Sequence, residues 1–131
     1  MSDIDEVPRP SGTLMLQTVA MPKDTNSAGD IFGGWLVSQM DLASGVAAAK
    51  IARGRVATVA IDNMSFMVPV KVGAIVSCYT EVLSVGRSSI QVQVEVWVTN
   101  PIMDEQSKVT EGVFVFVAID ENGRTRAVPT S

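Results

Sequence analysis

The most informative absence in this 131-residue sequence is histidine, which does not occur at all. Without histidine, the Ser-His-Asp and Cys-His nucleophile pairs are excluded, and so are the common catalytic zinc sites. A single cysteine, Cys78, excludes an intramolecular disulfide and a cysteine-based zinc site, so we expect no bound metal. Any acid–base chemistry therefore depends on carboxylates, lysine, tyrosine, backbone dipoles or water.

Basic stripes and long apolar runs are also missing. The ten basic residues are scattered along a chain of net charge −4, which argues against a nucleic-acid partner. No apolar run is long enough for a membrane span, and the acidic segment 1–10 lacks the basic and apolar regions of a signal peptide. We therefore expect a cytoplasmic protein with a mobile tail over residues 1–10 and a single domain over residues 11–131.

Apolar residues, in contrast, are abundant. They make up 47% of the chain, which is enough for a buried core, and the mean hydropathy of +0.28 is unusually high for a domain of this size. The excess predicts a subunit interface, a fatty ligand or both. Residues 33–52 form a helical pattern that is apolar on all faces, as is typical of a buried helix. Asp30 lies just before it and suits a helix N-terminus.

The rest of the chain has the pattern of β-strands. Strands are predicted at 13–21, 57–67, 74–85, 88–99 and 109–120, with a hairpin loop at Gly86 and Arg87. Short connections favour antiparallel pairing, so we expect a two-layer α+β domain with one sheet curled around one helix. Because one helix covers only one face of such a sheet, dimerisation through a sheet edge or face is expected.

Asp41 is the only charged residue between Ile31 and Ala49. Burying an unpaired carboxylate is costly, so Asp41 must be hydrogen-bonded, paired or exposed in a cleft. A carboxylate held in a cleft is a candidate general base. The alternative is that Asp41 simply faces solvent or an arginine of a partner subunit.

The loop before the helix contains three further candidates. Gly33 and Gly34 expose backbone N–H groups at a helix start, where the helix dipole adds partial positive charge and suits a developing oxyanion. Asn26 can donate and accept, so it could hold a water or a carbonyl. The plainer alternatives are a tight glycine turn close to the sheet and a local Asx-turn at Asn26.

A hairpin supplies the last candidate group. Arg87, Ser88 and Ser89 place a guanidinium and two hydroxyls together, which is a plausible grip for phosphate. An ordinary solvated turn has the same composition, so this pattern alone leaves both interpretations open.

Four stretches resemble a known family: 20–41 ("AMPKDTNSAGDIFGGWLVSQMD"), 54–79, 85–98 and 114–129. They are similar to the YciA-type acyl-CoA thioesterases of the hotdog superfamily, and together they cover nearly all of the chain beyond the first ten residues. The resemblance implies a hotdog fold, in which a five- to six-stranded antiparallel sheet wraps a long central helix.

The resemblance also implies a function and a set of site residues. The working unit would be a homodimer, assembled into a trimer of dimers, with the sites at the dimer interface and acyl-CoA as substrate. Asp41 matches the helix aspartate that these enzymes use as general base or nucleophile. Asn26 matches a loop asparagine that the other subunit contributes to the site. Gly33 and Gly34 match the segment that polarises the carbonyl, and Arg87 to Ser89 fall where CoA phosphates are expected. No cofactor is implied beyond the CoA moiety of the substrate.

Three other functions compete with thioester hydrolysis as explanations of this sequence. Hydratases and dehydratases of this fold pair an acid with a histidine, which this sequence lacks. A non-catalytic acyl-CoA-binding protein has no need of Asp41 beside a thioester. A purely structural oligomer leaves the motif from Asn26 to Asp41 unexplained. Turnover of an acyl-CoA separates the enzyme from the last two.

Overall fold

The computed structural model describes residues 8–130, so residues 1–7 and 131 lie outside the described residues. The elements, in chain order, are β1 (Thr13–Val19), the short 3-10 helix η2 (Pro22–Asp24), α1 (Gly33–Ala52), β2 (Val56–Phe66), β3 (Ile75–Val85), β4 (Ser89–Asn100) and β5 (Glu105–Ala118). Most of the predicted tail over 1–10 therefore falls outside the described part, and residues 8–10 belong to no helix or strand.

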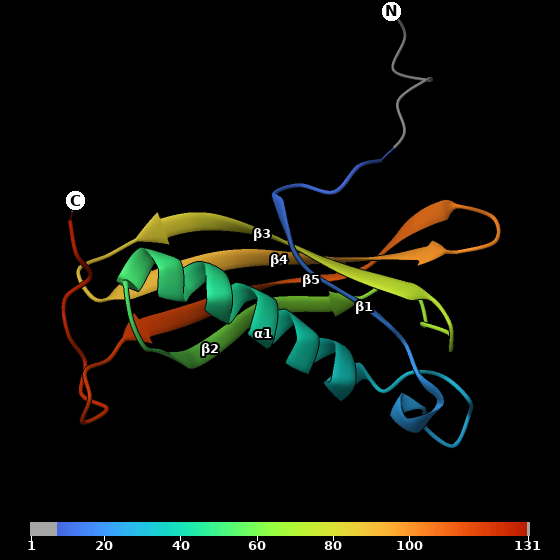
Figure 1. Cartoon of the computed structure of the whole chain (residues 1–131), viewed down its shortest axis with the longest axis horizontal. Helices are drawn as coiled ribbons and strands as arrows, with labels where there is room; N and C mark the ends of the chain where they lie inside the picture. Colours follow the sequence, from blue (N-terminus) through green and yellow to red (C-terminus); the bar gives the residue numbers. More distant parts are fainter. Residues whose placement is uncertain (1–7, 131) are drawn as a thin grey trace, which may run out of the picture.

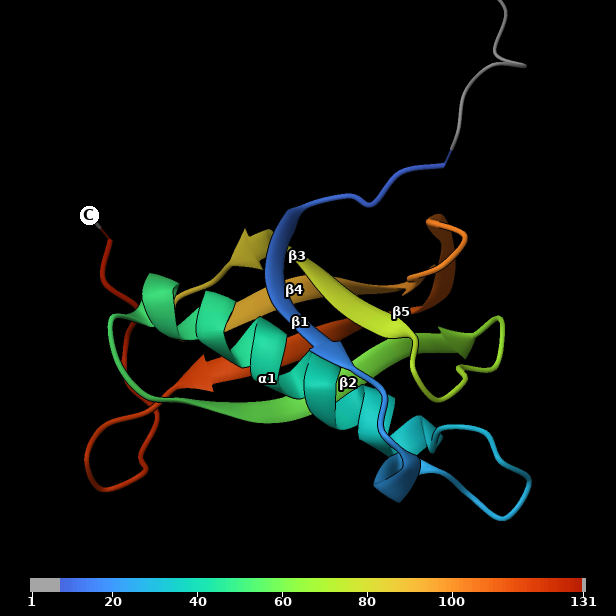
Figure 2. The ribbon, with the colours of Figure 1, turned by 45° about the vertical axis from the view of Figure 1, so that its right-hand side comes forward.

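The five strands form one antiparallel sheet in the order β1-β3-β4-β5-β2. The long helix α1 lies across one face of this sheet (Figures 1 and 2). Strands β1 and β2, which flank α1 in the sequence, are the two edges of the sheet. The predicted α+β fold, with one long helix packed on an antiparallel sheet, is confirmed.

The core lies between α1 and the sheet. On the helix, Leu36, Met40 and Ala47 are buried, and on β5 the stacked rings of Phe114 and Phe116 face them. The two layers pack directly on each other at Gly45, where a Cβ would be in ordinary van der Waals contact with the Phe116 ring at 3.8 Å. The core therefore fixes how α1 is placed on the sheet.

The opposite face of α1 is not covered. Leu42 and Val46 are 57% and 49% exposed, so the expectation of a helix buried on all sides is wrong for a single chain. On the neighbouring edge strand β2, Val59 and Ile61 are also exposed. An apolar helix face beside an unpaired strand edge is a surface suited to a second copy of the chain.

The start of α1 differs from the expectation in one respect. The N-cap residue is Phe32, which has no side chain able to cap the helix by a hydrogen bond. The carboxylate of Asp30 instead pairs with Lys71 at the β2–β3 connection. The first N–H groups of the helix are thus left without a side-chain cap.

The β4–β5 hairpin is longer than predicted. Strand β5 begins at Glu105, and residues 101–104 form the turn, with Asp104 in the left-handed region at a φ of 55°. The segment 100–108, which lies between the predicted strands 88–99 and 109–120, therefore extends the sheet. Within residues 8–130, no helix combines the length and apolar character that crossing a membrane requires.

Candidate active site

Asp41 lies in the middle of α1, half-buried, and faces the edge strand β2. The hydroxyl of Thr58 donates a hydrogen bond of 2.6 Å to Asp41 Oδ1, a length typical of an O–H donor on a charged carboxylate. The hydrogen bonds of residues 8–130 include none to Asp41 Oδ2. The structure thus holds the carboxylate in a fixed orientation and leaves one oxygen available for chemistry.

Thr58 is the residue that sequence reasoning missed. It lies within an otherwise apolar stretch of β2 and carries no charge, so its pattern is that of an ordinary strand residue. Only the packing of α1 on the sheet shows that its hydroxyl meets Asp41. The one signal in the sequence was a hydroxyl residue within an apolar strand. To use it, one would have to know which residues of β2 lie opposite Asp41 on α1.

Gly33 and Gly34 are the first two residues of α1 and both are exposed. Counting from the start of α1, the first backbone N–H that donates a hydrogen bond is that of Trp35, to the Phe32 carbonyl at 3.1 Å. The two glycine N–H groups therefore remain open donors at the positive end of the helix. A Cβ on Gly34 would meet nothing within 4 Å, so packing within the chain does not explain why glycine is there.

Asn26 closes a local turn. Its side-chain Oδ1 accepts hydrogen bonds from the backbone N–H of Ala28 at 2.9 Å and of Asp30 at 3.1 Å. This is the Asx-turn that the sequence left open as the plainer interpretation. With Oδ1 occupied, the side-chain nitrogen is the group of Asn26 that can still serve a ligand, and it serves as a donor.

A single chain does not bring these groups together. Gly33 and Gly34 precede Asp41 by eight and seven helical residues, which corresponds to about 10–12 Å along the axis. A donor and a base acting on one carbonyl each lie about 3 Å from it. The loop between η2 and α1, which carries Asn26, lies beyond the start of α1 (Figure 2). Within one chain, Asp41 and the glycine N–H groups are therefore too far apart to act on the same carbonyl.

The β3–β4 hairpin holds Arg87, Ser88 and Ser89. Their backbone carbonyls accept hydrogen bonds from Val128, Ala118 and Gly86 respectively, so the turn is tied to the C-terminal segment and to itself. The Arg87 side chain is exposed. Figure 1 shows the turn at the end of the sheet where α1 finishes, away from the start of the helix.

Cys78 is excluded as a nucleophile. It is fully buried in β3, and burial raises the pKa of its thiol to about 12. The thiolate, which is the reactive form, is therefore scarce at neutral pH.

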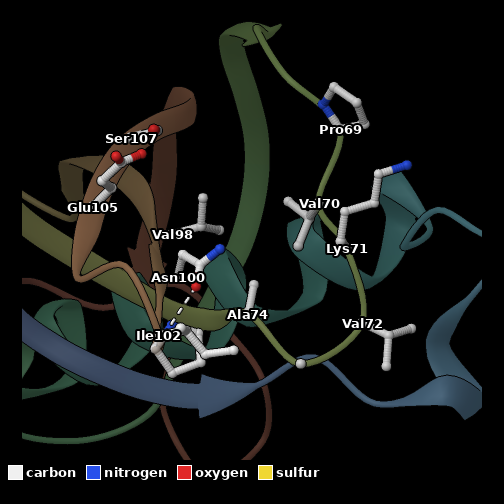
Figure 3. A pocket seen from close by; sticks show the side chains of 12 residues that line it. Pro69, Val70, Lys71, Val72, Ala74, Val98, Asn100, Ile102, Glu105 and Ser107 are labelled. Carbon is white, nitrogen blue, oxygen red and sulfur yellow. Dashed lines mark hydrogen bonds between the residues drawn. The ribbon is translucent and has the colours of Figure 1, made fainter.

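A hollow of about 480 Å³ opens between residues 69–74 and the β4–β5 hairpin over residues 98–107 (Figure 3). In the sheet, Thr58 of β2 pairs with Phe116 of β5, which in turn pairs with Ile90 of β4. Val98, which lines the hollow, lies eight residues further along β4. Eight strand residues span about 27 Å. The hollow is therefore far from the Asp41–Thr58 pair of the same chain.

Comparison with known proteins gives a consistent result. The family model of the thioesterase superfamily matches residues 28–102. A Haemophilus influenzae protein named as an uncharacterized acyl-CoA thioester hydrolase is 54% identical, over 90% of this chain and 79% of its own. The acyl-CoA thioester hydrolase YciA of Escherichia coli is 48% identical, over 92% and 93% of the two chains.

Solved structures agree in fold. The crystal structure of an aspartate-to-alanine mutant of a hexameric, broad-specificity acyl-coenzyme A thioesterase matches with a TM-score of 0.89 at 51% identity. The match covers 92% of this chain and 89% of that one. With this fold and with relatives this similar over almost the whole chain, the protein belongs to the thioesterase superfamily, in its YciA-type branch of acyl-CoA thioester hydrolases.

Proposed function

We propose that this protein hydrolyses acyl-CoA thioesters to a fatty acid and CoA, with Asp41 as general base or nucleophile. The observation that carries the proposal is the orientation of Asp41 by Thr58, with its second oxygen left available. The relatives named as acyl-CoA thioester hydrolases support the substrate class. The matched thioesterase that was studied as an aspartate-to-alanine mutant supports the choice of residue type.

A second copy of the chain completes each site. It contributes Asn26, Gly33 and Gly34, because these groups lie too far from Asp41 within one chain. The exposed apolar face of α1 and the unpaired edge of β2 support a homodimer with the sites at its interface. Three such dimers would form a hexamer, the assembly that the matched acyl-CoA thioesterase has.

Binding places the thioester carbonyl against the open N–H groups of Gly33 and Gly34. As the carbon becomes tetrahedral, negative charge develops on the oxygen, and fixed donors at a helix N-terminus stabilise that charge. The side-chain nitrogen of Asn26 adds a third donor to the carbonyl or to the attacking water. Because glycine has no side chain, the substrate can approach this backbone closely.

Asp41 then acts in one of two ways. As a base, its carboxylate takes a proton from water, and the resulting hydroxide adds to the carbonyl carbon. As a nucleophile, its oxygen adds directly and forms a mixed anhydride that water later hydrolyses. On either route the C–S bond breaks and the electron pair leaves with sulfur. A thiol pKa of about 8.5 makes the thiolate a good leaving group, so no histidine is needed as acid.

The hairpin residues Arg87, Ser88 and Ser89 are proposed to bind CoA phosphate. Support comes from the exposed guanidinium of Arg87 and from the backbone bonds that hold the turn in place. A rigid turn presents donors with little loss of conformational freedom on binding.

The experiment that tests the function is thiol release from a series of acyl-CoAs, from short to long chains. We expect CoA release, with the chain-length profile showing which acyl group is preferred. Absence of release from every acyl-CoA by a folded oligomer would contradict the proposal. In that outcome, tight binding of acyl-CoA would indicate a non-catalytic binding protein instead.

Thr58 is proposed as a positioning residue for Asp41. Thr58→Val keeps the shape of the side chain and removes the hydroxyl, so we expect kcat to fall by about ten- to a hundredfold, the range for losing a hydrogen bond to a charged group. KM should change little, and Thr58→Ser should restore most of kcat. A valine variant with unchanged kcat would show that the 2.6 Å contact has no part in turnover.

A further inference from the structure

Asp30 holds Asn26 from two sides. Its backbone N–H donates to Asn26 Oδ1 at 3.1 Å, and its carbonyl accepts the backbone N–H of Asn26 at 2.7 Å. The backbone N–H of Ala28 also donates to Asn26 Oδ1, at 2.9 Å. By holding the amide oxygen, these bonds direct the amide nitrogen, which is a donor, away from the turn. The direction in which the Asn26 donor points therefore depends on where Asp30 lies.

The residues between Asn26 and Asp30 give this turn little support of their own. Residues 27–29 are exposed, and a Cβ built on Gly29 would meet nothing within 4 Å. Gly29 has a φ of 86°, in the left-handed region that glycine adopts without strain. The turn thus projects from the surface of the chain, and it has to be fixed from its ends.

The end of the turn at Asp30 is attached to the β2–β3 connection at two neighbouring points. The next residue, the buried Ile31, donates its backbone N–H to the carbonyl of Val70 at 3.0 Å. The carboxylate of Asp30 forms an ion pair with Lys71, which follows Val70 in the chain. Because a single attachment leaves a segment free to rotate about it, the ion pair supplies the second constraint on the turn.

The Asp30–Lys71 pair is too exposed to contribute much to the stability of the whole fold. The side chain of Lys71 is 70% exposed and that of Asp30 is 30% exposed. Exposed ion pairs add little to the free energy of unfolding, because water and salt screen them. Local opening of a loop, however, costs far less free energy than global unfolding. A weak pair can therefore still govern the position of a projecting turn.

A purely electrostatic role for Lys71 is the competing explanation. Asp30 lies three residues before Gly33, close to the positive end of α1. An uncompensated carboxylate there would repel the negative oxygen that develops at the N–H groups of Gly33 and Gly34. On this account Lys71 only neutralises Asp30, and the position of the turn is irrelevant. Removing both charges together distinguishes the two explanations.

We propose that the Asp30–Lys71 ion pair positions Asn26 for catalysis, by holding its turn so that the side-chain nitrogen meets the thioester or the attacking water. The catalytic part rests on the proposed function, whereas the restraint on the turn rests only on the contacts of this chain. In this role Asp30 and Lys71 are positioning residues, and neither touches the reacting atoms. Their loss misplaces a donor that acts in the transition state, so it lowers kcat more than it raises KM.

The first experiment compares backbone hydrogen exchange in the wild-type oligomer and in Lys71→Met, and it needs no hydrolysis. We expect residues 26–30 to exchange roughly two- to fivefold faster in the variant, the range for loss of an exposed ion pair, with the melting temperature unchanged. Lys71→Arg keeps the charge and should exchange like wild type. Lys23→Met is the matched control, because Lys23 is 77% exposed and pairs with its own neighbour Asp24. Equal exchange in wild type and Lys71→Met would overturn the proposal, whether or not the protein hydrolyses acyl-CoA.

The second experiment measures kcat and KM of the same variants with one acyl-CoA. In Lys71→Met we expect kcat to fall roughly fivefold or more with KM nearly unchanged, and Lys71→Arg should restore kcat. Lys23→Met should turn over like wild type.

The double variant Asp30→Asn/Lys71→Met removes the uncompensated carboxylate together with the ion pair, and it should stay as slow as Lys71→Met. Recovery of wild-type kcat in the double variant would overturn the proposal in favour of the electrostatic role. Unchanged kcat in Lys71→Met would also overturn it. Absence of turnover by the wild type would contradict the proposed function instead, and the exchange experiment would still decide whether the ion pair restrains the turn.

Discussion

Asp41→Asn is expected to lower kcat by about a thousandfold or more while leaving the fold and the oligomer intact. Asparagine has nearly the same shape and can still accept the hydroxyl proton of Thr58, so the contact at 2.6 Å survives. The variant loses only the negative charge, and with it the ability to take a proton from water or to attack a carbonyl. The measurement is thiol release at saturating acyl-CoA, with circular dichroism and sizing to verify folding.

A matched control is available on the neighbouring strand. Asp62 is an exposed aspartate of β2, and Asp62→Asn removes the same charge without touching the Asp41–Thr58 pair. We expect this control to turn over like wild type. A folded Asp41→Asn enzyme with kcat within tenfold of wild type would remove Asp41 from the mechanism.

Most of the fold could be predicted because its signals are local. The helix over 33–52 was predicted with the bounds that the structure has, and β4 follows the alternation of Ile90, Val92 and Val94 that marks one buried face. These patterns depend only on residues close in the sequence. The later start of the predicted last strand is the exception, since residues 105–108 carry little apolar pattern and join β5 by pairing with β4.

The candidate site was harder to predict because its contacts are between distant residues. Asp41 could be recognised as an isolated charge, but its partner Thr58 is set by how α1 packs on β2. The exposure of Leu42 and Val46 likewise depends on which face of α1 the sheet covers, and an apolar helix gives no sign of that. Both features follow from tertiary packing rather than from residue type.

The clustering of the basic residues also depends on contacts between distant parts of the chain. In the sequence, Arg53, Arg87 and Arg124 are far apart, and the basic residues are scattered. In the structure, the hydrogen bonds from Ala118 to Ser88 and from Val128 to Arg87 bring their segments to one end. Long-range backbone pairing thus turns a scattered set of cations into a cluster.

Two inactive variants are expected to restore activity to each other when they are assembled together. Asn26→Asp keeps the Oδ1 acceptor that closes the turn and removes the side-chain donor, so we expect kcat to fall by about a hundredfold. If Asp41 and Asn26 of each site come from different copies, a mixed dimer of Asp41→Asn and Asn26→Asp has one site with both changes and one intact site. Random pairing makes half of the dimers mixed, so about a quarter of wild-type activity should return.

The control for this experiment pairs two changes in the same half-site. Thr58 and Asp41 of one chain contact each other, so mixing Thr58→Val with Asp41→Asn creates no intact site and should show no gain over the average of the separate variants. The mixed oligomers can be made by coexpression with two different affinity tags, and capture of a small sample through one tag with detection of the other verifies that mixing has occurred. Recovery in the Asn26 mixture but not in the Thr58 mixture requires that the Asp41 and the Asn26 of each site come from different copies. If mixed oligomers form and no activity is recovered in the Asn26 mixture, Asp41 and Asn26 of each site belong to the same chain. The start of α1 would then have to unwind to bring them together.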